Sequence, residues 1–178
     1  MKFKANLMDQ EAMERALKRM AHQIIEKNAG SKNLVFVGIK RRGVPLARTL
    51  SAYVSAFEGG QFPVEELDIS LYRDDLSEIA EEPQISIEEF SQDINGKTVI
   101  LVDDVLFTGR TVRAALDALS QHGRAKSIQL AVLVDRGHRE LPIRADFVGK
   151  NVPTSLEELV SVEVEEYDHV TKVDLYSL

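Results

Sequence analysis

The feature that most constrains this chain is an apolar run that leads into two carboxylates and a small-residue turn. Val99 to Val102 is followed by Asp103 and Asp104, and then by the turn Thr108 to Thr111. A short β-branched run bounded by turn residues is typical of a strand buried on both faces. Beyond the turn, apolar residues recur at helical spacing: Val112, Ala115, Leu116 and Leu119. The sequence therefore predicts a strand that ends at the carboxylates, a loop, and a helix.

The turn after this strand has the chemistry of a phosphate site. In open α/β sheets, ligands bind beyond the carboxyl ends of the strands, and the free N–H groups and dipole of a helix start attract anions. Gly109 allows close backbone approach, and Thr108 and Thr111 add hydroxyl donors. Asp103 and Asp104 are then placed to accept hydrogen bonds from sugar hydroxyls. The pattern indicates a ribose phosphate site, or a metal held near one.

Two other interpretations of the acidic pair stay open at this point. Both aspartates can simply cap a surface loop, or they can belong to a receiver-type acidic pocket, which does not need the Thr-Gly-Arg-Thr turn. The chain has neither G-x-x-x-x-G-K-[ST] nor G-x-G-x-x-G after a strand, so other common phosphate motifs do not fit. The combination of strand, acidic pair, turn and helix favours the sugar phosphate.

A second predicted strand, Leu34 to Ile39, ends in a cluster of cations. Three basic residues and a glycine follow it: Lys40, Arg41, Arg42 and Gly43. Gly43 supplies a permissive backbone, and Pro45 suits the first turn of a helix that we expect to run through Tyr53. Three cations beside exposed amides predict a second anion site. The alternative is a plain turn between strand and helix.

Composition bounds the class of protein. With 178 residues, 44% hydrophobic and 29% charged, one globular domain over residues 1–178 is expected. The absence of cysteine excludes disulfides and thiolate chemistry, and the four histidines lack metal-ligand spacing. There is no apolar signal core and no run of membrane-spanning length. We therefore expect a cytoplasmic protein without a membrane partner.

The net charge of -7 argues against generic nucleic-acid binding, but its distribution is uneven. The window from Arg73 to Asp93 holds eight of the 29 carboxylates and one of the 22 basic residues, so 21 of each sign remain outside it. An amphipathic helix is expected from Glu11 to Lys27, with Met13, Ala16, Leu17, Met20, Ala21, Ile24 and Ile25 buried. Basic residues lie off that stripe, which makes a basic face possible on an acidic protein.

The remaining pattern predicts an α/β fold. Val64 to Tyr72 has Leu67, Ile69 and Leu71 on one face, as in a half-buried strand, and a long polar loop follows it. Asn95-Gly96 is a turn signal, and Ile128 to Val134 is a further strand. Two strand–helix–strand units predict a parallel sheet. Arg136 to Ile143 is a loop, and short strands are expected at Phe147-Val148, Leu159 to Val164 and Val170 to Tyr176.

Several of these segments resemble the type I phosphoribosyltransferases. Val99 to Thr111 resembles the loop of that family that binds phosphoribosyl pyrophosphate (PRPP). Further similarity is found in three segments: Val37 to Gly43, Leu71 to Leu76 and Val134 to Asp146. Within the family, nearly the whole chain is similar to bacterial proteins that are both uracil phosphoribosyltransferases and attenuators of pyrimidine operons. The segment from Arg136 to Asp146 separates these proteins from other phosphoribosyltransferases.

The resemblance implies a type I phosphoribosyltransferase fold, with a central, mainly parallel sheet, flanking helices, a small hood and a flexible acidic loop. The loop would cover residues 73–93, and the hood would start near residue 136 and include the C-terminal strands. The implied reaction converts uracil and PRPP into UMP and pyrophosphate, with Mg²⁺ bound mainly through PRPP and not by a dedicated protein site. The implied catalytic residues are Asp103, Asp104 and Arg73. The implied substrate contacts are Lys40, Arg41, Arg42, Gly43, Asp103, Asp104, Val105, Leu106, Phe107, Thr108, Gly109, Arg110, Thr111, Arg136 and Val160.

The same resemblance implies an RNA surface for the leader mRNA of pyrimidine operons, with binding governed by UMP or UTP. Its basic residues would be Arg15, Lys18, Arg19, His22, Lys27, Arg139, Arg144 and Lys150. Lys18 stands where the family has threonine, which adds charge. A homodimer is expected, with further assembly open. Two other functions stay open: a nucleotide-sensing RNA regulator without turnover, and a purine salvage phosphoribosyltransferase. The cation cluster and the long acidic loop favour turnover.

Overall fold

The computed structural model describes residues 1–72 and 88–178, and its centre is a five-stranded sheet with all pairs parallel. The strand order is β3-β2-β4-β5-β6. The strands are β2 (Leu34–Ile39), β3 (Val64–Leu67), β4 (Thr98–Leu106), β5 (Ser127–Asp135) and β6 (Phe147–Asn151). The predicted parallel sheet is confirmed.

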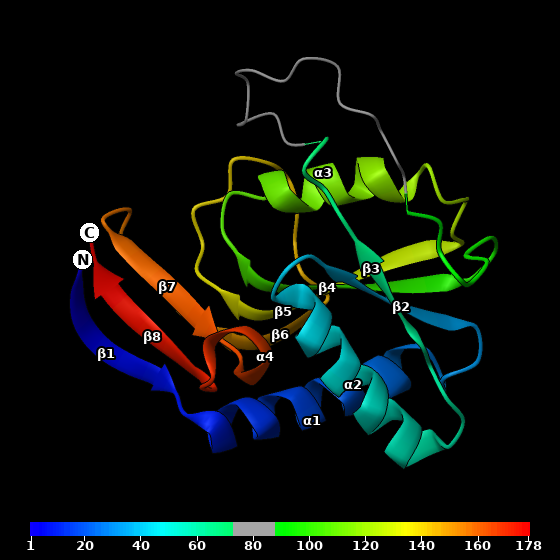
Figure 1. Cartoon of the computed structure of the whole chain (residues 1–178), viewed down its shortest axis with the longest axis horizontal. Helices are drawn as coiled ribbons and strands as arrows, with labels where there is room; N and C mark the ends of the chain where they lie inside the picture. Colours follow the sequence, from blue (N-terminus) through cyan, green and yellow to red (C-terminus); the bar gives the residue numbers. More distant parts are fainter. Residues whose placement is uncertain (73–87) are drawn as a thin grey trace.

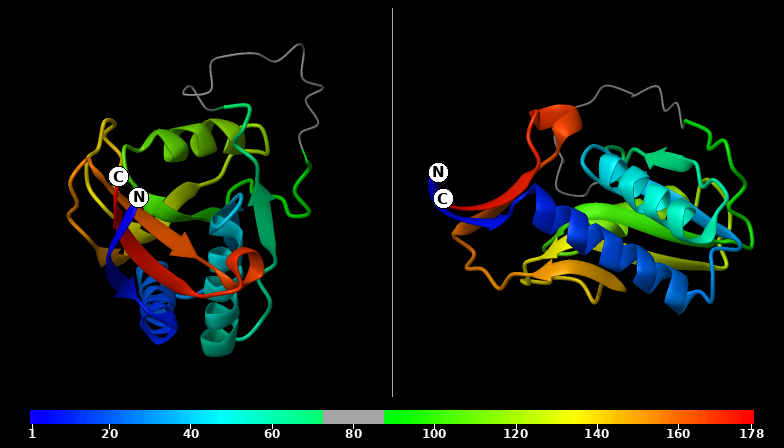
Figure 2. Two further views of the ribbon diagram at one scale, coloured as in Figure 1. Left: turned by 60° about the vertical axis from the view of Figure 1, so that its left-hand side comes forward. Right: turned by 90° about the horizontal axis from the view of Figure 1, so that it is seen from below.

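Helices cover both faces of this sheet. Helices α1 (Gln10–Lys27) and α2 (Gly43–Glu58) lie side by side on one face, and α3 (Arg110–Leu119) lies on the other (Figures 1 and 2). Two apolar clusters fill the layers, one under α1 and α2 and one under α3. No helix in the described ranges is both long and apolar enough to cross a membrane.

A second, three-stranded antiparallel sheet lies at the carboxyl ends of β4 and β5 (Figure 1). Its order is β1-β8-β7, and the short helix α4 (Glu165–Asp168) connects the last two strands. The strands are β1 (Lys2–Met8), β7 (Glu158–Glu163) and β8 (Lys172–Ser177). We call this layer, with α4, the hood sheet. Pairing of β1 with β8 brings the two ends of the chain together.

The strongest sequence patterns are confirmed. Strand β2 has the predicted bounds, α1 begins one residue earlier than predicted, and α2 continues past Tyr53 to Glu58. Six of the seven residues predicted for the apolar stripe of α1 are buried, and Ile25 is half-buried. Amphipathic spacing therefore located the faces of α1 correctly.

Two strand boundaries were wrong. Strand β3 ends at Leu67, because the Asp68 carboxylate accepts the Ser70 N–H at 2.9 Å and begins a turn. As a result Leu71, predicted to be buried, is 49% exposed. Strand β4 does not end at the carboxylates but continues to Leu106, because its pairing with β5 extends to Leu106 opposite Asp135.

The predicted flexible loop lies outside the described residues from 73 to 87, and Arg73 lies there too. The last residues of the predicted loop, which the structure describes, contact the rest of the protein. Phe90 stacks on His122 at 3.7 Å between ring centroids, and the Ser91 and Gln92 N–H groups donate to the Glu65 carboxylate at 3.2 and 3.1 Å. Three residues that the prediction assigned to the loop, 90–92, thus contact the rest of the protein.

Candidate functional site

The acidic pair lies near the carboxyl end of β4, just before the strand ends at Leu106. Asp103 is 7% exposed, and Asp104 is half-buried. The Oδ1 atom of Asp103 accepts the Asp104 N–H at 2.9 Å, and Oδ1 of Asp104 accepts the Val105 N–H at 2.8 Å. Each carboxylate is therefore oriented by the backbone N–H group of the residue that follows it.

Directly after the pair, residues 105–112 and Glu140 line a cavity of about 270 Å³, which we call the cup. Helix α3 starts here with Gly109 as its cap residue, at φ 95°, a conformation that suits glycine. The first N–H groups of a helix have no partner within the helix, and α3 starts among the residues that line the cup. The Thr108 hydroxyl accepts the Arg110 N–H at 3.3 Å. The cup is therefore rich in donors for an anion.

The loop from Arg136 to Ile143 forms one wall of the cup. The backbone N–H groups of Glu140 and Leu141 donate to the Thr108 carbonyl at 2.9 and 3.2 Å. The Glu140 carboxylate accepts from Arg110 Nε at 2.7 Å. The wall and the cup are thus one hydrogen-bonded unit, although they are about 30 residues apart in sequence.

The cation loop, Lys40 to Gly43, lies against the acidic end of β4. A side chain at Gly43 would meet the Val102 carbonyl oxygen at 2.4 Å, so glycine is required there by close approach. The sequence predicted a permissive backbone at this position, but the backbone is helical and the constraint is space. Close packing of this loop on β4 brings the two predicted anion sites to one edge of the sheet.

Each cation of this loop has a protein partner. Lys40 Nζ donates to Glu88 at 2.8 Å, which raises the pKa of Lys40, and Glu66 lies 3.8 Å away. Arg42 pairs with Asp168 of α4 at 2.8 Å, and Arg41 lies over the ring of Tyr167. Two of the three cations are thus paired with carboxylates, and the third lies over an aromatic ring.

Arg136 is buried at the junction of the cup and the hood sheet, with 5% of its surface exposed. Its guanidinium donates to the Thr154 hydroxyl at 3.0 Å and to the Ser155 carbonyl at 2.9 Å, and it lies 4.0 Å from the centre of the Phe107 ring. Burial lowers the pKa of Arg136 below its ordinary value. Val160 on β7 is 6% exposed and packs in the apolar cluster, so it has little surface to offer a ligand.

The predicted RNA-binding residues lie in more than one place on the molecule. Arg15, Arg19 and Lys150 line a hollow of about 350 Å³ between α1 and β6. Lys27 and Arg144 line a larger polar hollow of about 630 Å³ farther along the same edge. These five lie along the side of the molecule where α1 meets β6.

Lys18 and His22 lie on the α2 side of α1. Lys18 Nζ is 5.5 Å from the ring centre of Tyr53, and His22 stacks on Phe57 at 3.9 Å. Arg139 is placed differently again. Its guanidinium donates to the Phe107 and Ile143 carbonyls at 2.8 and 2.9 Å and pairs with Asp135.

Several residues around the site were not found from the sequence. They include Thr154, Tyr167 and Asp168, which contact site residues from positions more than ten residues away. The acidic segment Glu165 to Asp168 was the one available signal, and it was not interpreted. In residues 1–72 and 88–178, no three histidine or carboxylate side chains gather into a metal site.

Comparison with known proteins identifies similar families and folds. Residues 4–166 match the phosphoribosyl transferase domain family. A bifunctional protein PyrR from Clostridium novyi is 57% identical over 176 residues, covering 99% of each chain. One from Thermus aquaticus is 58% identical over 176 residues, covering 99% of this chain and 97% of the relative.

Among solved structures, a hypoxanthine phosphoribosyltransferase from Trypanosoma cruzi superposes with a TM-score of 0.74 at 18% identity, covering 98% of this chain and 97% of the other. One from Staphylococcus aureus gives 0.72 at 23% identity, covering 97% and 92%. At these identities the likeness establishes the fold alone.

Proposed function

The chain belongs to the phosphoribosyl transferase family, and within it to the PyrR proteins; from that premise we propose that it transfers ribose phosphate from PRPP to uracil and regulates pyrimidine operons through their leader mRNA. Its fold is the type I phosphoribosyltransferase fold. The high identity to PyrR proteins over the whole chain supports both halves of this function.

One observation carries the enzymatic half: the start of α3 lines a cavity that directly follows Asp103 and Asp104 of β4. We assign the 5′-phosphate to the backbone N–H groups of the cup and to the hydroxyls of Thr108 and Thr111. The ribose hydroxyls then donate to the two carboxylates. Such a site holds a ribose phosphate by both ends of its sugar.

In the reaction, the bond from ribose C1 to the pyrophosphate oxygen breaks, and a bond from a uracil nitrogen to C1 forms. The uracil nitrogen loses its proton to water. Positive charge grows on the ribose and negative charge on the departing pyrophosphate. Fixed charges that match this distribution lower the barrier without covalent chemistry. Asp103 and Asp104 face the ribose, and the cation loop faces the leaving group.

We assign the pyrophosphate to Lys40, Arg41, Arg42 and the N–H groups at Gly43. Mg²⁺ fits this arrangement, because carboxylate and phosphate oxygens are the ligands it prefers. Since the described residues lack a cluster of three acidic side chains, the ion would take most of its ligands from PRPP, with Asp103 and Asp104 nearby. The ion would neutralise charge on the pyrophosphate.

The base would lie between the cup and the hood sheet. Phe107 and Arg136 are stacked there, which supports a flat, partly charged floor for uracil. Val105 and Leu106 complete the β4 side, and we place Val160 behind this layer, where it fixes the shape of the pocket without exposing much surface. We propose Arg73, which lies outside the described residues, as a further catalytic residue on the grounds of family resemblance.

For the regulatory half, we propose that the leader mRNA lies along the edge where α1 meets β6. The side chains of Arg15, Arg19, Lys27, Arg144 and Lys150 line that edge and would position its phosphates. Lys18 and His22, on the α2 side of α1, would extend the contact around that helix. Loops or bulges of the RNA would be read for their sequence. Arg139, whose guanidinium points into the wall of the cup, would act on RNA through that wall. We propose UMP or UTP as effector and a homodimer as the minimal assembly.

A panel of bases tests the enzymatic half. Purified protein with PRPP and Mg²⁺ should release pyrophosphate and form UMP in equal amounts when uracil is supplied. Hypoxanthine, guanine and adenine should give no more than the rate without base. Turnover of a purine in preference to uracil would contradict the assignment, and nucleotide binding without any turnover would favour a pure sensor.

A further inference from the structure

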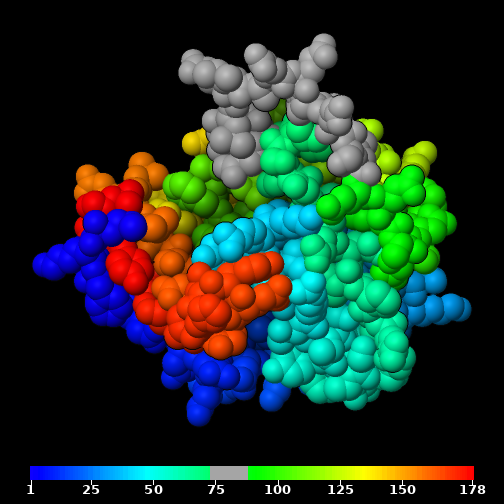
Figure 3. All heavy atoms as spheres, in the orientation of Figure 1, coloured from blue at the N-terminus to red at the C-terminus, as the bar shows by residue number. Residues whose placement is uncertain are grey.

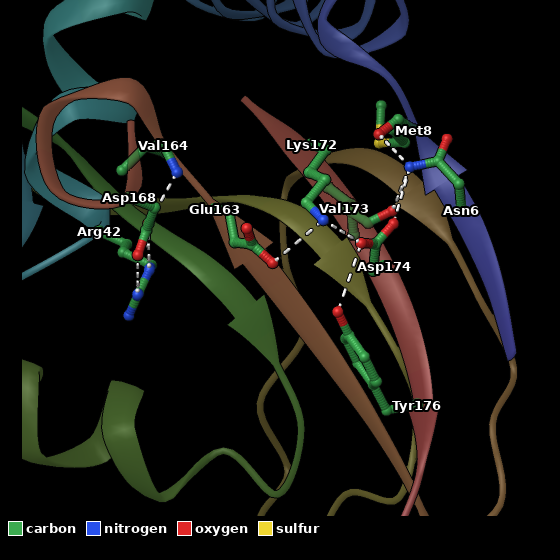
Figure 4. A network of polar contacts seen from close by, with 10 residues as sticks. All are labelled: Asn6, Met8, Arg42, Glu163, Val164, Asp168, Lys172, Val173, Asp174 and Tyr176. Carbon is green, nitrogen blue, oxygen red and sulfur yellow. Dashed lines mark hydrogen bonds and ion pairs between the residues drawn. The ribbon is translucent and has the colours of Figure 1, made fainter. Parts of the chain in front are cut away.

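Helix α4 carries two consecutive side chains that meet two consecutive arginines of the cation loop. The Asp168 carboxylate accepts from Arg42 Nε at 3.2 Å and from Nη2 at 2.8 Å. The ring centre of Tyr167 lies 4.6 Å from the guanidinium carbon of Arg41. Figure 4 shows the Arg42–Asp168 pair beside the hood sheet, and in Figure 3 the orange-red residues around α4 lie against the light-blue start of α2.

Asp168 is oriented by its own turn. Its Oδ2 atom accepts the Val164 N–H at 2.9 Å, and its backbone N–H donates to the Val164 carbonyl at 2.8 Å. The hydrogen bonds from Arg42 lower the pKa of Asp168 below its ordinary value, so the carboxylate is charged at neutral pH. A fixed, charged carboxylate facing a planar guanidinium makes a directional two-bond pair.

Other carboxylates besides Asp168 act on the charge of Arg42. Its pKa is raised first by the hydrogen bonds to Asp168, and further by the charges of Asp104 and Glu163 nearby. Asp104 is one of the two carboxylates that we assign to the ribose. The two-bond pair with Asp168 thus fixes where the Arg42 guanidinium lies among these charges.

Both contacts leave donors available to an anion. The pair with Asp168 uses Nε and Nη2 of Arg42 and does not use Nη1. A guanidinium stacked on a ring keeps its N–H groups in its own plane, so Arg41 also stays able to donate. Asp168 and Tyr167 can therefore orient the two arginines without using all of the N–H groups that would bind an anion.

We propose that α4 is a positioning element for the pyrophosphate half of the site, in which Asp168 orients Arg42 and Tyr167 orients Arg41. Neither residue touches substrate, and both act through the arginines. This inference rests on the proposed function, because it assigns pyrophosphate to the cation loop. It makes pyrophosphate binding depend on α4 as well. Helix α4 connects the hood strands β7 and β8 and belongs neither to the cup nor to the acidic pair.

The first test is Asp168→Asn, which keeps the shape and can still accept the Val164 N–H. The KM for PRPP and the inhibition constant of pyrophosphate should rise by roughly tenfold to a hundredfold, the scale of losing hydrogen bonds between charged groups. The KM for uracil should change by less than about threefold, since the base lies at the other end of the site. Asp168→Glu, which keeps the charge, should recover part of the loss.

Tyr167→Leu should give a smaller change of the same kind, and Tyr167→Phe should resemble wild type, because the ring is kept.

Glu166→Gln is the matched control. Glu166 also lies on α4, but it pairs with Arg48 of α2 at 3.1 Å and not with the cation loop. If α4 only needed to be attached to the protein, Glu166→Gln and Asp168→Asn would behave alike. We expect Glu166→Gln to leave the KM for PRPP within about twofold of wild type, as is usual for an exposed ion pair.

A double-mutant cycle separates positioning from general damage. In an Arg42→Ala background, Asp168→Asn should have little further effect on pyrophosphate inhibition, because the group it orients is gone. Additive effects, or equal losses of uracil and PRPP binding with an unchanged melting temperature, would overturn the inference. The proposed function fails separately, if wild type itself forms no UMP.

Discussion

At the scale of single residues, the acidic pair of β4 is the part of the site whose side chains the neighbouring backbone orients most directly. Two neighbouring carboxylates repel each other, and each is compensated by a backbone N–H within one residue. Burial of Asp103 to 7% exposure makes its charge more effective toward a ligand than the charge of a surface carboxylate. Residue type and position thus already define the end of the site that we propose for the ribose.

Asp103→Asn and Asp104→Asn keep shape and remove charge beside the ribose. We expect kcat/KM for uracil to fall by roughly two to four orders of magnitude, the scale of losing a key electrostatic or acid–base group. Steady-state kinetics at saturating Mg²⁺ measure this. Asp117→Asn, an exposed change on α3, is the control and should match wild type. Near-normal turnover in both site variants would remove the pair from the mechanism.

Residue types in the site could be predicted from the sequence, but their partners could not. The strand, acidic pair, turn and cation cluster are local patterns within about ten residues. Asp168, by contrast, is 126 residues from Arg42, and Thr154 is 18 residues from Arg136. Such pairs depend on how the hood sheet packs on the parallel sheet, which no local spacing encodes.

At the scale of elements, sequence analysis succeeded where burial follows a regular period. Strand β2 and helix α1 have continuous apolar patterns, and their bounds were predicted to within one residue. Strand β1 was missed because its pattern is mostly exposed and it exists only through pairing with β8 at the other end of the chain. Helix α4 was missed because four acidic and polar residues carry no apolar period.

Gly43→Ala tests the packing of the cation loop on β4. A Cβ atom would lie 2.4 Å from the Val102 carbonyl oxygen, so the loop or the strand must move. We expect the free energy of unfolding in urea to fall by about 1–3 kcal/mol, as for other overpacked sites, together with a higher KM for PRPP. Ser55→Ala, farther along α2, should change stability by less than about 0.5 kcal/mol. Equal stability of the two variants would show that the close approach is not required.

The hood sheet should give the protein part of its acid sensitivity. Asp174 is 2% exposed; burial raises its pKa, but hydrogen bonds from Lys172 and Asn6 outweigh this and lower the pKa overall (Figure 4). A carboxylate whose pKa is lower in the folded state stabilises the fold above its unfolded pKa, here about 3.8, and loses this contribution as the pH falls through the folded value.

Asp174→Asn should therefore be less stable than wild type at pH 7, and the difference should shrink as the pH falls below about 4. Urea unfolding across a pH series measures both quantities. A difference that stays constant from pH 7 to pH 3 would mean that packing, and not the charge of Asp174, accounts for the loss.

At the scale of the whole molecule, one sheet connects the nucleotide site to the basic edge. The cup follows β4, its wall follows β5, and β6 lies next to β5 and against α1. Arg139 joins the Phe107 carbonyl of the cup to Asp135 at the end of β5, and the Asp135 carbonyl accepts the Val152 N–H just after β6. These contacts form a continuous chain from the cup to the α1–β6 edge, which is the route we propose for coupling between the two.

Arg19→Ala should separate the two activities. The Arg19 guanidinium donates to the Val148 and Gly149 carbonyls at the α1–β6 edge, away from the cup. We expect weaker binding of the leader hairpin, with uracil turnover within about twofold of wild type, as for a surface substitution. Arg124→Ala, an exposed basic residue between α3 and β5, is the control and should bind RNA normally. Loss of catalysis and RNA binding together in Arg19→Ala would make that residue structural.

The linkage between nucleotide site and RNA surface is tested most directly by titrating wild-type protein with leader hairpin and with an unrelated hairpin, with and without UMP. Salt must be fixed, because phosphate contacts make affinity fall steeply as salt rises. UMP should tighten binding of the leader hairpin by about 5- to 150-fold, the usual range of coupling between sites, and the hairpin should tighten UMP by the same factor. Equal affinity for both hairpins, unchanged by UMP, would contradict a nucleotide-governed RNA regulator and leave a uracil phosphoribosyltransferase alone.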